Sequence, residues 1–310
     1  MSPSSPPPAT PGAFRLAHLT DPHVGPLSTP RLRQLLNKRA TGWVNWRRGR
    51  KGAHDMEVLA ALVADIHLAA PDHIACTGDL CNIGLPSEWP TARVFLEGLG
   101  PPASVSFVPG NHDAYVRGSL KGLLAECAPW TRDDEGREAK FPYLRRRGSV
   151  ALVGLSTAIP TAPFVASGRL GHAQIAAAEG LLAALAREEG RPCRIVMIHH
   201  PPHQTGALPG RNLTDAHAFE AMIARVGAEL VLHGHNHVGS VAFLVGPGGR
   251  RVPAIGAPSA SARGGTLTHR AGYHLYTITR EAQGFGVAAA LRGLMPDGRI
   301  GDLGTLTLAA

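Results

Sequence analysis

Cysteine is scarce in this sequence and shows no pattern of pairing. The four cysteines are Cys76, Cys81, Cys127 and Cys193, and no two of them form a C-x-x-C pair. A dense disulfide framework is therefore excluded as the source of stability. Free thiols of this kind are typical of a reducing compartment, so we expect a cytoplasmic protein.

Long apolar runs are also missing. No stretch approaches the length needed to span a bilayer. The opening residues, MSPSSPPPATPG, have no basic region followed by an apolar run, and we therefore expect no signal peptide. Their composition predicts a disordered Pro/Ser-rich tail over residues 1–12.

Acidic residues are absent from one stretch of the chain. Residues 24–54 contain eight basic side chains and no Asp or Glu, and the whole chain has a net charge of +8. The excess of positive charge is therefore local. It indicates one basic surface, which would contact an anionic partner. The basic side chains are Arg31, Arg33, Lys38, Arg39, Arg47, Arg48, Arg50 and Lys51.

The rest of the chain alternates short apolar runs with helical patterns, without an internal repeat or a long linker. Buried strands are predicted at 14–20, 73–78, 104–110, 149–156, 194–200 and 229–234, and helices at 55–70, 171–190 and 215–227. Asp55 is the expected N-cap of the first helix. We predict a single α/β domain over 13–310, with closing strands after about residue 270.

Polar residues of metal-binding type follow nearly every central strand. In α/β proteins, ligands gather beyond the carboxyl ends of the strands, so these residues are candidates for one common site. The five segments are LTDPHVG with Asp21 and His23, CTGDLCN with Asp79, VPGNHDAY with Asn111, His112 and Asp113, MIHHPPH with His199 and His200, and LHGHNHVG with His235 and His237.

As an ordered set, these segments resemble the motifs of the calcineurin-like metallophosphoesterases: D-x-H, G-D, G-N-H-[D/E], H and G-H-x-H. The resemblance runs from Asp21 to His237. Within that superfamily, the motifs of this chain are similar to those of the bacterial cyclic-nucleotide phosphodiesterases. It implies two packed, mainly mixed β-sheets flanked by helices, a four-layer α/β/β/α sandwich.

The resemblance also implies two metal ions and a set of ligands for each of them. Asp79 would bridge the metals, with Asp21, His23 and His237 completing the first site and Asn111, His199 and His235 the second. Nitrogen and oxygen ligands without thiolate favour Mn, Fe or Zn. Such a pair neutralises phosphoryl oxygens and lowers the pKa of a bound water.

Two further residues receive catalytic roles by the same resemblance. His112 would stabilise or protonate the leaving oxygen, and Asp113 would orient His112. His200 and His203 lie beside a predicted ligand and are candidates for contact with the substrate.

The basic segment at about 30–52 is an insertion between the first motif and the first long helix, so it should emerge near the metals. Leu32, Leu35, Leu36, Ala40 and Trp43 have helical spacing, which predicts a short amphipathic helix broken at Gly42. Residues 31–51 could pack on the protein's own core, dock on an anionic membrane, where the enzyme would sit at the inner face, or contact nucleic acid. Arg47 and Arg48 are candidates for substrate binding.

Four functions are consistent with these features. The first is a phosphodiesterase that uses a metal-bound hydroxide. The second is a membrane-surface phosphoesterase acting on phospholipid or nucleotide–lipid head groups, which the basic segment motivates. The others are a DNA nuclease, which would need an additional capping domain, and a non-catalytic scaffold of the same fold. A scaffold has no need of a complete ligand set.

Overall fold

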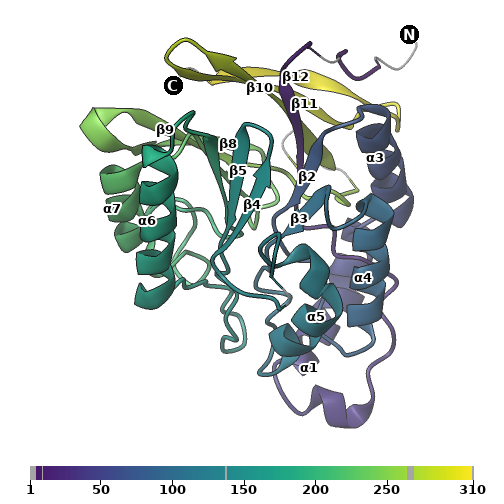
Figure 1. Ribbon diagram of the computed structural model, residues 1–310. Coiled ribbons are helices and arrows are strands. Elements are labelled where there is room, and N and C mark those ends of the chain that lie inside the picture. Colours follow the sequence, from purple (N-terminus) through teal and green to yellow (C-terminus); the bar gives the residue numbers. More distant parts are fainter. Residues whose placement is uncertain (1–4, 9, 137, 264–268, 309–310) are drawn as a thin grey trace.

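The computed structural model describes residues 5–8, 10–136, 138–263 and 269–308. Two six-stranded sheets face one another, with helices on both outer surfaces (Figure 1). This arrangement confirms the predicted four-layer sandwich. Part of the 1–12 segment lies outside the described residues, and in the described part the carbonyl of Pro7 accepts a hydrogen bond from the Arg15 guanidinium at 2.8 Å.

The first sheet combines three parallel strands with the closing strands. β1, β2 and β3 pair in parallel, and β10 joins β1 in antiparallel orientation and continues into β11 and β12. The strands are β1 (Phe14–Leu19), β2 (His73–Cys76), β3 (Val105–Phe107), β10 (Gly272–Glu281), β11 (Gly284–Leu294) and β12 (Ile300–Leu308).

The second sheet has a parallel centre and antiparallel edges. β5, β6, β7 and β9 run in parallel, while β4 and β8 pair with them in antiparallel orientation. Both sheets are therefore mixed. The strands are β4 (Tyr143–Arg147), β5 (Val150–Gly154), β6 (Cys193–Met197), β7 (Leu230–His233), β8 (Ser240–Val245) and β9 (Arg251–Gly256).

Three layers of apolar side chains hold the sandwich together. One lies between the first sheet and α3, α4 and α5, one between the second sheet and α6 and α7, and one between the two sheets. Burial of this apolar surface is the main stabilising contribution to such a fold. The helices are α3 (Met56–Leu68), α4 (Glu88–Leu99), α5 (Ser119–Cys127), α6 (His172–Arg187) and α7 (Ala216–Val226), with short 3-10 turns η3 (Ala128–Trp130) and η4 (Pro247–Gly249).

The helix predicted at 55–70 forms for the expected reasons. The Asp55 side chain accepts hydrogen bonds from the N–H groups of Glu57 and Val58 and so caps α3. Leu59, Leu62 and Ile66 are buried along one stripe. Within the described residues, no helix has both the length and the apolar character required to cross a bilayer.

The basic segment differs from its prediction. It consists of a 3-10 helix η1 (Leu32–Leu35), α1 (Arg39–Asn45), a π-helical turn η2 (Trp46–Arg50) and α2 (Lys51–Ala53). Gly42 does not break a helix but lies inside α1. A Cβ at this position would collide with the Tyr115 hydroxyl and with Ile83, so Gly42 allows close packing instead.

Candidate metal centre

The predicted ligands meet at one edge of the sandwich. Each follows the carboxyl end of β1, β2, β3, β6 or β7, and the parallel strands bring those ends together. Asp21, His23, Asp79, Asn111, His199 and His235 are all buried. We call this set, together with the partly exposed His237, the floor of the site.

A first group of donors surrounds Asp21. Nε2 of His237 lies 3.2 Å from Oδ1 of Asp21 and 3.3 Å from Nε2 of His23. Nε2 of His23 lies 3.9 Å from Oδ2 of Asp79. Two ligands held about 2.1 Å from one metal are separated by about 3 to 3.5 Å, so these four side chains could hold one ion.

A second group shares Asp79 with the first. Nε2 of His199 lies 3.4 Å from Oδ2 of Asp79 and 3.2 Å from Oδ1 of Asn111. Nδ1 of His235 lies 2.9 Å from the same Asn111 oxygen. Because Oδ2 of Asp79 faces both groups, this carboxylate could bridge two ions.

The donor chemistry fits metal ions. Nδ1 of His23 donates to the carbonyl of Cys81, and Nδ1 of His199 donates to the carbonyl of Thr77. When these rings are neutral, the Nε2 atoms that face the floor present lone pairs, as ligand histidines do. Donor atoms this close to one another and to carboxylate oxygens are stabilised by a positive charge between them, either a metal ion or a proton. Oδ1 of Asp21 is also buried, and among the described residues it accepts no hydrogen bond of good geometry, although Nε2 of His237 lies 3.2 Å away.

The floor's electrostatics point the same way. Burial alone would lower the pKa of His199, and the carboxylate of Asp79 overcomes this effect and raises that pKa to about 9. For Asp21, burial opposes ionisation, but His237 and the other nearby histidines hold the pKa of the carboxyl well below its usual value. The carboxylate is thus anionic and ready to bind a cation.

The backbone of the floor has an unusual conformation. Five of the seven predicted ligands have positive φ: Asp21 at 50°, His23 at 40°, Asp79 at 56°, His235 at 71° and His237 at 57°. Side chains rarely adopt this region, and each such residue costs about 1–2 kcal/mol. Strain of this kind collects at functional sites.

The glycine before Asp79 has a specific function in this arrangement. Gly78 has a φ of 106°, and a Cβ there would run into the ring of His199 and the backbone of Gly110. Only glycine allows the loop after β2 to pass so close to the loops after β3 and β6.

His112 and Asp113 lie beside the floor, between the loops that carry Asp79 and Asn111. Nδ1 of His112 donates to the carbonyl of Asn82. The Asp113 carboxylate accepts hydrogen bonds from the N–H groups of Asp79, Cys81 and Gly110, at 2.8–3.0 Å. Its observed contacts hold the loop of Asp79 against the loop of Asn111, and a backbone carbonyl orients His112. Burial, then the charge of Asp79, raises the pKa of Asp113 to about 7.

A cavity of about 260 Å³ opens above the floor. Its walls come from the basic segment through Lys38, Thr41, Asn45 and Trp46, from residues 164–166, and from Arg211. The prediction that the basic segment emerges beside the metal ligands is therefore correct in position.

Lys38 has an unusual position in that wall. It is half-buried, and its Nζ donates to Oγ1 of Thr161 at 2.7 Å and to the carbonyl of Val165 at 2.8 Å. Within the described part of the chain, no carboxylate lies within 4 Å of this ammonium group. Burial lowers the pKa of Lys38, and the charge of Asp79 opposes that effect. Buried charges are normally paired, so Lys38 is suited to an anionic ligand.

Four predicted substrate contacts are not among the lining residues of this cavity. His200 is buried, with Nδ1 2.7 Å from Oγ1 of Thr157 and Nε2 3.0 Å from the carbonyl of Ala166. His203 is only half-buried and lies 3.3 Å from Oγ1 of Thr205. Arg47 and Arg48 extend into solvent. Within the residues that the structure describes, the pocket wall is built by other side chains.

The sequence patterns missed His54. Its ring centroid lies 4.5 Å from that of His23 and 5.8 Å from that of His237, and one ring nitrogen of each of the three lies within 4.8 Å of the others. Nδ1 of His54 lies 2.7 Å from Oγ1 of Ser261. A single histidine after a basic run carries no motif, so only the fold could reveal it.

The fold and the donor set define a metallophosphoesterase sandwich. The chain belongs to the calcineurin-like phosphoesterases, since the model of that family matches residues 14–239. Members of the family use divalent metal ions. None of the curated protein sequences matches the chain.

Solved structures show the same fold at low identity. The purple acid phosphatase PPD1 from yellow lupin is 14% identical, with a TM-score of 0.59, and the alignment covers 99% of this chain and 55% of that one. The 5'-nucleotidase precursor from Thermus thermophilus is 17% identical, with a TM-score of 0.50, over 89% of this chain and 54% of that one. The chain thus spans about half the length of these proteins.

Proposed function

We propose that this protein is a binuclear-metal-dependent hydrolase of phosphate esters, and specifically a phosphodiesterase. The observation that carries the proposal is the pair of donor groups that share Asp79. In this assignment Asp21, His23 and His237 hold one ion with Asp79, and Asn111, His199 and His235 hold the other. Mn, Fe and Zn suit such a donor set.

The metals, when bound, neutralise the phosphoryl oxygens and make a water nucleophilic at neutral pH. His112 acts on the leaving group. Because the carbonyl of Asn82 can only accept, Nδ1 of His112 carries a proton. Nε2 of the protonated ring is then available to donate a proton to the leaving oxygen.

Asp113 supports the reaction indirectly. Its three hydrogen bonds to backbone N–H groups fix the loop that presents Asp79 next to the loop that presents Asn111. The N–H of His112 in turn donates to Oδ1 of Asp79 at 2.7 Å, while Oδ2 faces His23 and His199, so Asp79 would be held in place to take part in both metal sites. Asp113 is therefore a positioning residue.

The cavity supports a diester. Its wall carries the cations Lys38 and Arg211 beside apolar surface from Trp46, Tyr115 and Phe164. The cations can bind the phosphate charge, and the apolar surface can cover the second ester substituent.

Two of the other functions can be separated from this one. A non-catalytic scaffold would not need the complete donor set of the floor. A DNA nuclease would use the exposed arginines to track a nucleic-acid backbone, and would cleave DNA in preference to small diesters.

The deciding experiment is hydrolysis by the full chain loaded with Mn, and in parallel with Fe or Zn. We expect turnover of bis(p-nitrophenyl) phosphate to exceed that of p-nitrophenyl phosphate, and to stop when a chelator removes the metals. Full activity in Asn111→Ala would show that the reaction takes place elsewhere. A preference for the monoester would replace the phosphodiesterase assignment with a phosphatase.

A further inference from the structure

Three segments that form the cavity wall also carry exposed apolar side chains. In the described residues, the large hydrophobic side chains with the greatest exposure are Leu32, Leu36, Leu68, Phe164 and Leu208, at 75–86%. Leu68 lies at the end of α3, but the other four lie on segments that contribute residues to the cavity wall. Such a grouping is unusual, since single exposed apolar side chains are normally scattered.

Sequence neighbours tie each of the four to the cavity wall. Leu36 lies two residues before Lys38, and Leu32 is in the η1 turn just ahead of it. Phe164 itself lines the cavity. Leu208 accepts a hydrogen bond through its carbonyl from the N–H of Arg211, another lining residue.

Hydrogen bonds join the three segments into one surface. The Nζ of Lys38 donates to the carbonyl of Val165, and the N–H of Ala166 donates to the carbonyl of Gly210. The basic segment, the loop of Phe164 and the loop of Leu208 therefore lie side by side. We call Leu32, Leu36, Phe164 and Leu208, with the arginines below, the rim.

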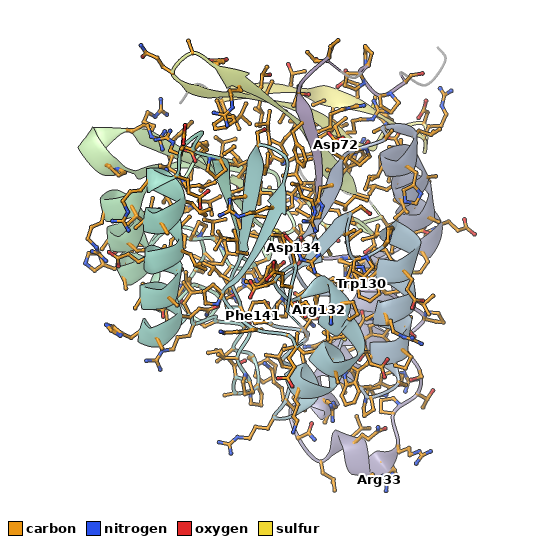
Figure 2. The ribbon with its side chains drawn as sticks, in the orientation of Figure 1. Arg33, Asp72, Trp130, Arg132, Asp134 and Phe141 are labelled. Atoms are coloured by element: carbon orange, nitrogen blue, oxygen red, sulfur yellow. The ribbon has the colours of Figure 1, made fainter. Side chains whose placement is uncertain are left out.

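The rim also has a uniform charge. Arg31, Arg33, Arg47, Arg48 and Arg211 are exposed. Within the described part of the chain, no carboxylate lies within 4 Å of any of these guanidinium groups. Figure 2 shows Arg33 at the lower tip of the molecule, at the opposite end from the sheet of β10–β12 seen in Figure 1.

The combination selects a particular partner. The three leucines of the rim bury CH₂ and CH₃ groups in hydrocarbon but have no aromatic face on which a base could stack, and Phe164 is the rim's one aromatic side chain. Trp43 and Trp46 stack on each other, with ring centroids 5.2 Å apart, so part of their aromatic surface is already covered. Exposed arginines around exposed leucines match an anionic lipid surface better than a nucleic-acid strand.

We propose that the rim docks on an anionic lipid bilayer, with Leu32, Leu36, Phe164 and Leu208 inserted at the interface. The cavity then opens onto the lipid head groups, and Lys38 and Arg211 lie where a phosphate would enter. The substrate is accordingly a phosphate ester in a lipid head group, a conclusion that rests on the proposed phosphoesterase function. The docking itself rests only on the rim.

The test is co-sedimentation of the Mn-loaded full chain with vesicles of phosphatidylglycerol and, in parallel, of phosphatidylcholine. We expect binding to phosphatidylglycerol only, weakening as salt is added because surface charges are screened. The combined variant Leu32→Ser, Leu36→Ser, Leu208→Ser should bind at least about tenfold more weakly. Arg31→Gln with Arg33→Gln should weaken binding less, and chiefly at low salt.

Matched controls remove equivalent groups elsewhere. Leu68→Ser removes an equally exposed leucine, and Arg187→Gln removes an exposed arginine at the end of α6. Both should bind vesicles like the parent protein. All variants should keep the parent's unfolding temperature, since the replaced side chains are exposed.

Hydrolysis separates the two proposals. The leucine variant should cleave bis(p-nitrophenyl) phosphate within about twofold of the parent rate, but should lose activity on phosphatidylglycerol vesicles. Failure to cleave the soluble ester in the parent protein would overturn the proposed function without touching the docking. Failure to sediment, equal loss in Leu68→Ser, or tighter binding to single-stranded DNA than to vesicles would overturn the docking.

Discussion

The floor and the rim are built in opposite ways. The floor consists of buried side chains on strained backbone, cross-linked through hydrogen bonds such as those of Asp113. The rim consists of short helical turns and loops with exposed side chains. Chemistry requires atoms fixed to within a fraction of an ångström, whereas an approach surface requires only its charge and its apolar area. On the assignments proposed above, the molecule separates reaction from recognition.

The largest effect should come from the bridging carboxylate. Asp79→Asn removes the charge that faces both donor groups, so we expect both metals to be lost and turnover to fall by more than the roughly 10- to 100-fold typical of residues behind metal ligands. Metal content by mass spectrometry and turnover of a soluble diester measure this. Asp72→Asn, on the surface, is the control. Retained metal and activity would mean that the floor is not the reaction site.

His112→Ala should come next. Loss of a proton donor typically lowers a rate about 10²- to 10⁴-fold, and metal content should stay unchanged because His112 is not assigned as a ligand. The loss should shrink for esters with very acidic leaving groups, which need no proton. A loss of metal together with activity would instead make His112 a ligand.

Asp113→Ala tests whether the hydrogen bonds of Asp113 hold the metal ligands in place. It removes the acceptor of three backbone hydrogen bonds, so metal affinity should fall about 10- to 100-fold. The measurement is a metal titration followed by calorimetry. Unlike His112→Ala, this variant should recover activity at high metal concentration, and no recovery would contradict a positioning role.

His54→Ala should have a smaller effect on the same titration. Because His54 lies beside His23 and His237, we expect weaker binding at the first metal site, by about tenfold or less. His67→Ala, on α3, is the control. Binding equal to the parent would leave His54 outside the metal centre.

Lys38→Gln tests the boundary between floor and rim. Lys38 faces the cavity, and no carboxylate of the described residues lies within 4 Å of it, so KM for a diester should rise several-fold, with little change in kcat. Burial lowers the pKa of Lys38, so the ammonium form should be lost at a lower pH than for an ordinary lysine. KM of the parent should therefore rise in the alkaline range, and this rise should be absent from Lys38→Gln. A rise of equal size in both would assign it to another group.

The fold and the ordered motif residues could be read from the sequence because each depends on local pattern. The strand at 194–200 is indicated by a continuous apolar run, and the Asp55 cap by its position directly before a helical pattern. Motif order then implied a common edge, and the structure brings Asp21 within reach of His237 over more than two hundred residues.

Other features depend on contacts that no pattern records. Lys38 and Arg39 are neighbours with the same charge, yet Lys38 faces the cavity while Arg39 turns inward to the carbonyls of Ile83 and Gly84. Gly42 was predicted to break a helix because a glycine's packing partner, here Tyr115, is not visible in sequence. Phe164 and Leu208 join the rim from distant loops for the same reason.

The inward course of Arg39 has a consequence for protein engineering. Its guanidinium binds the basic segment to the loop that follows Asp79. The residues before Arg39 can therefore be exchanged while this attachment stays in place. A graft that exchanges residues 31–37 while keeping Arg39 and Gly42 should redirect the enzyme to new surfaces without rebuilding its reactive centre. A graft that also replaces Arg39 should disturb both the basic segment and the reactive centre.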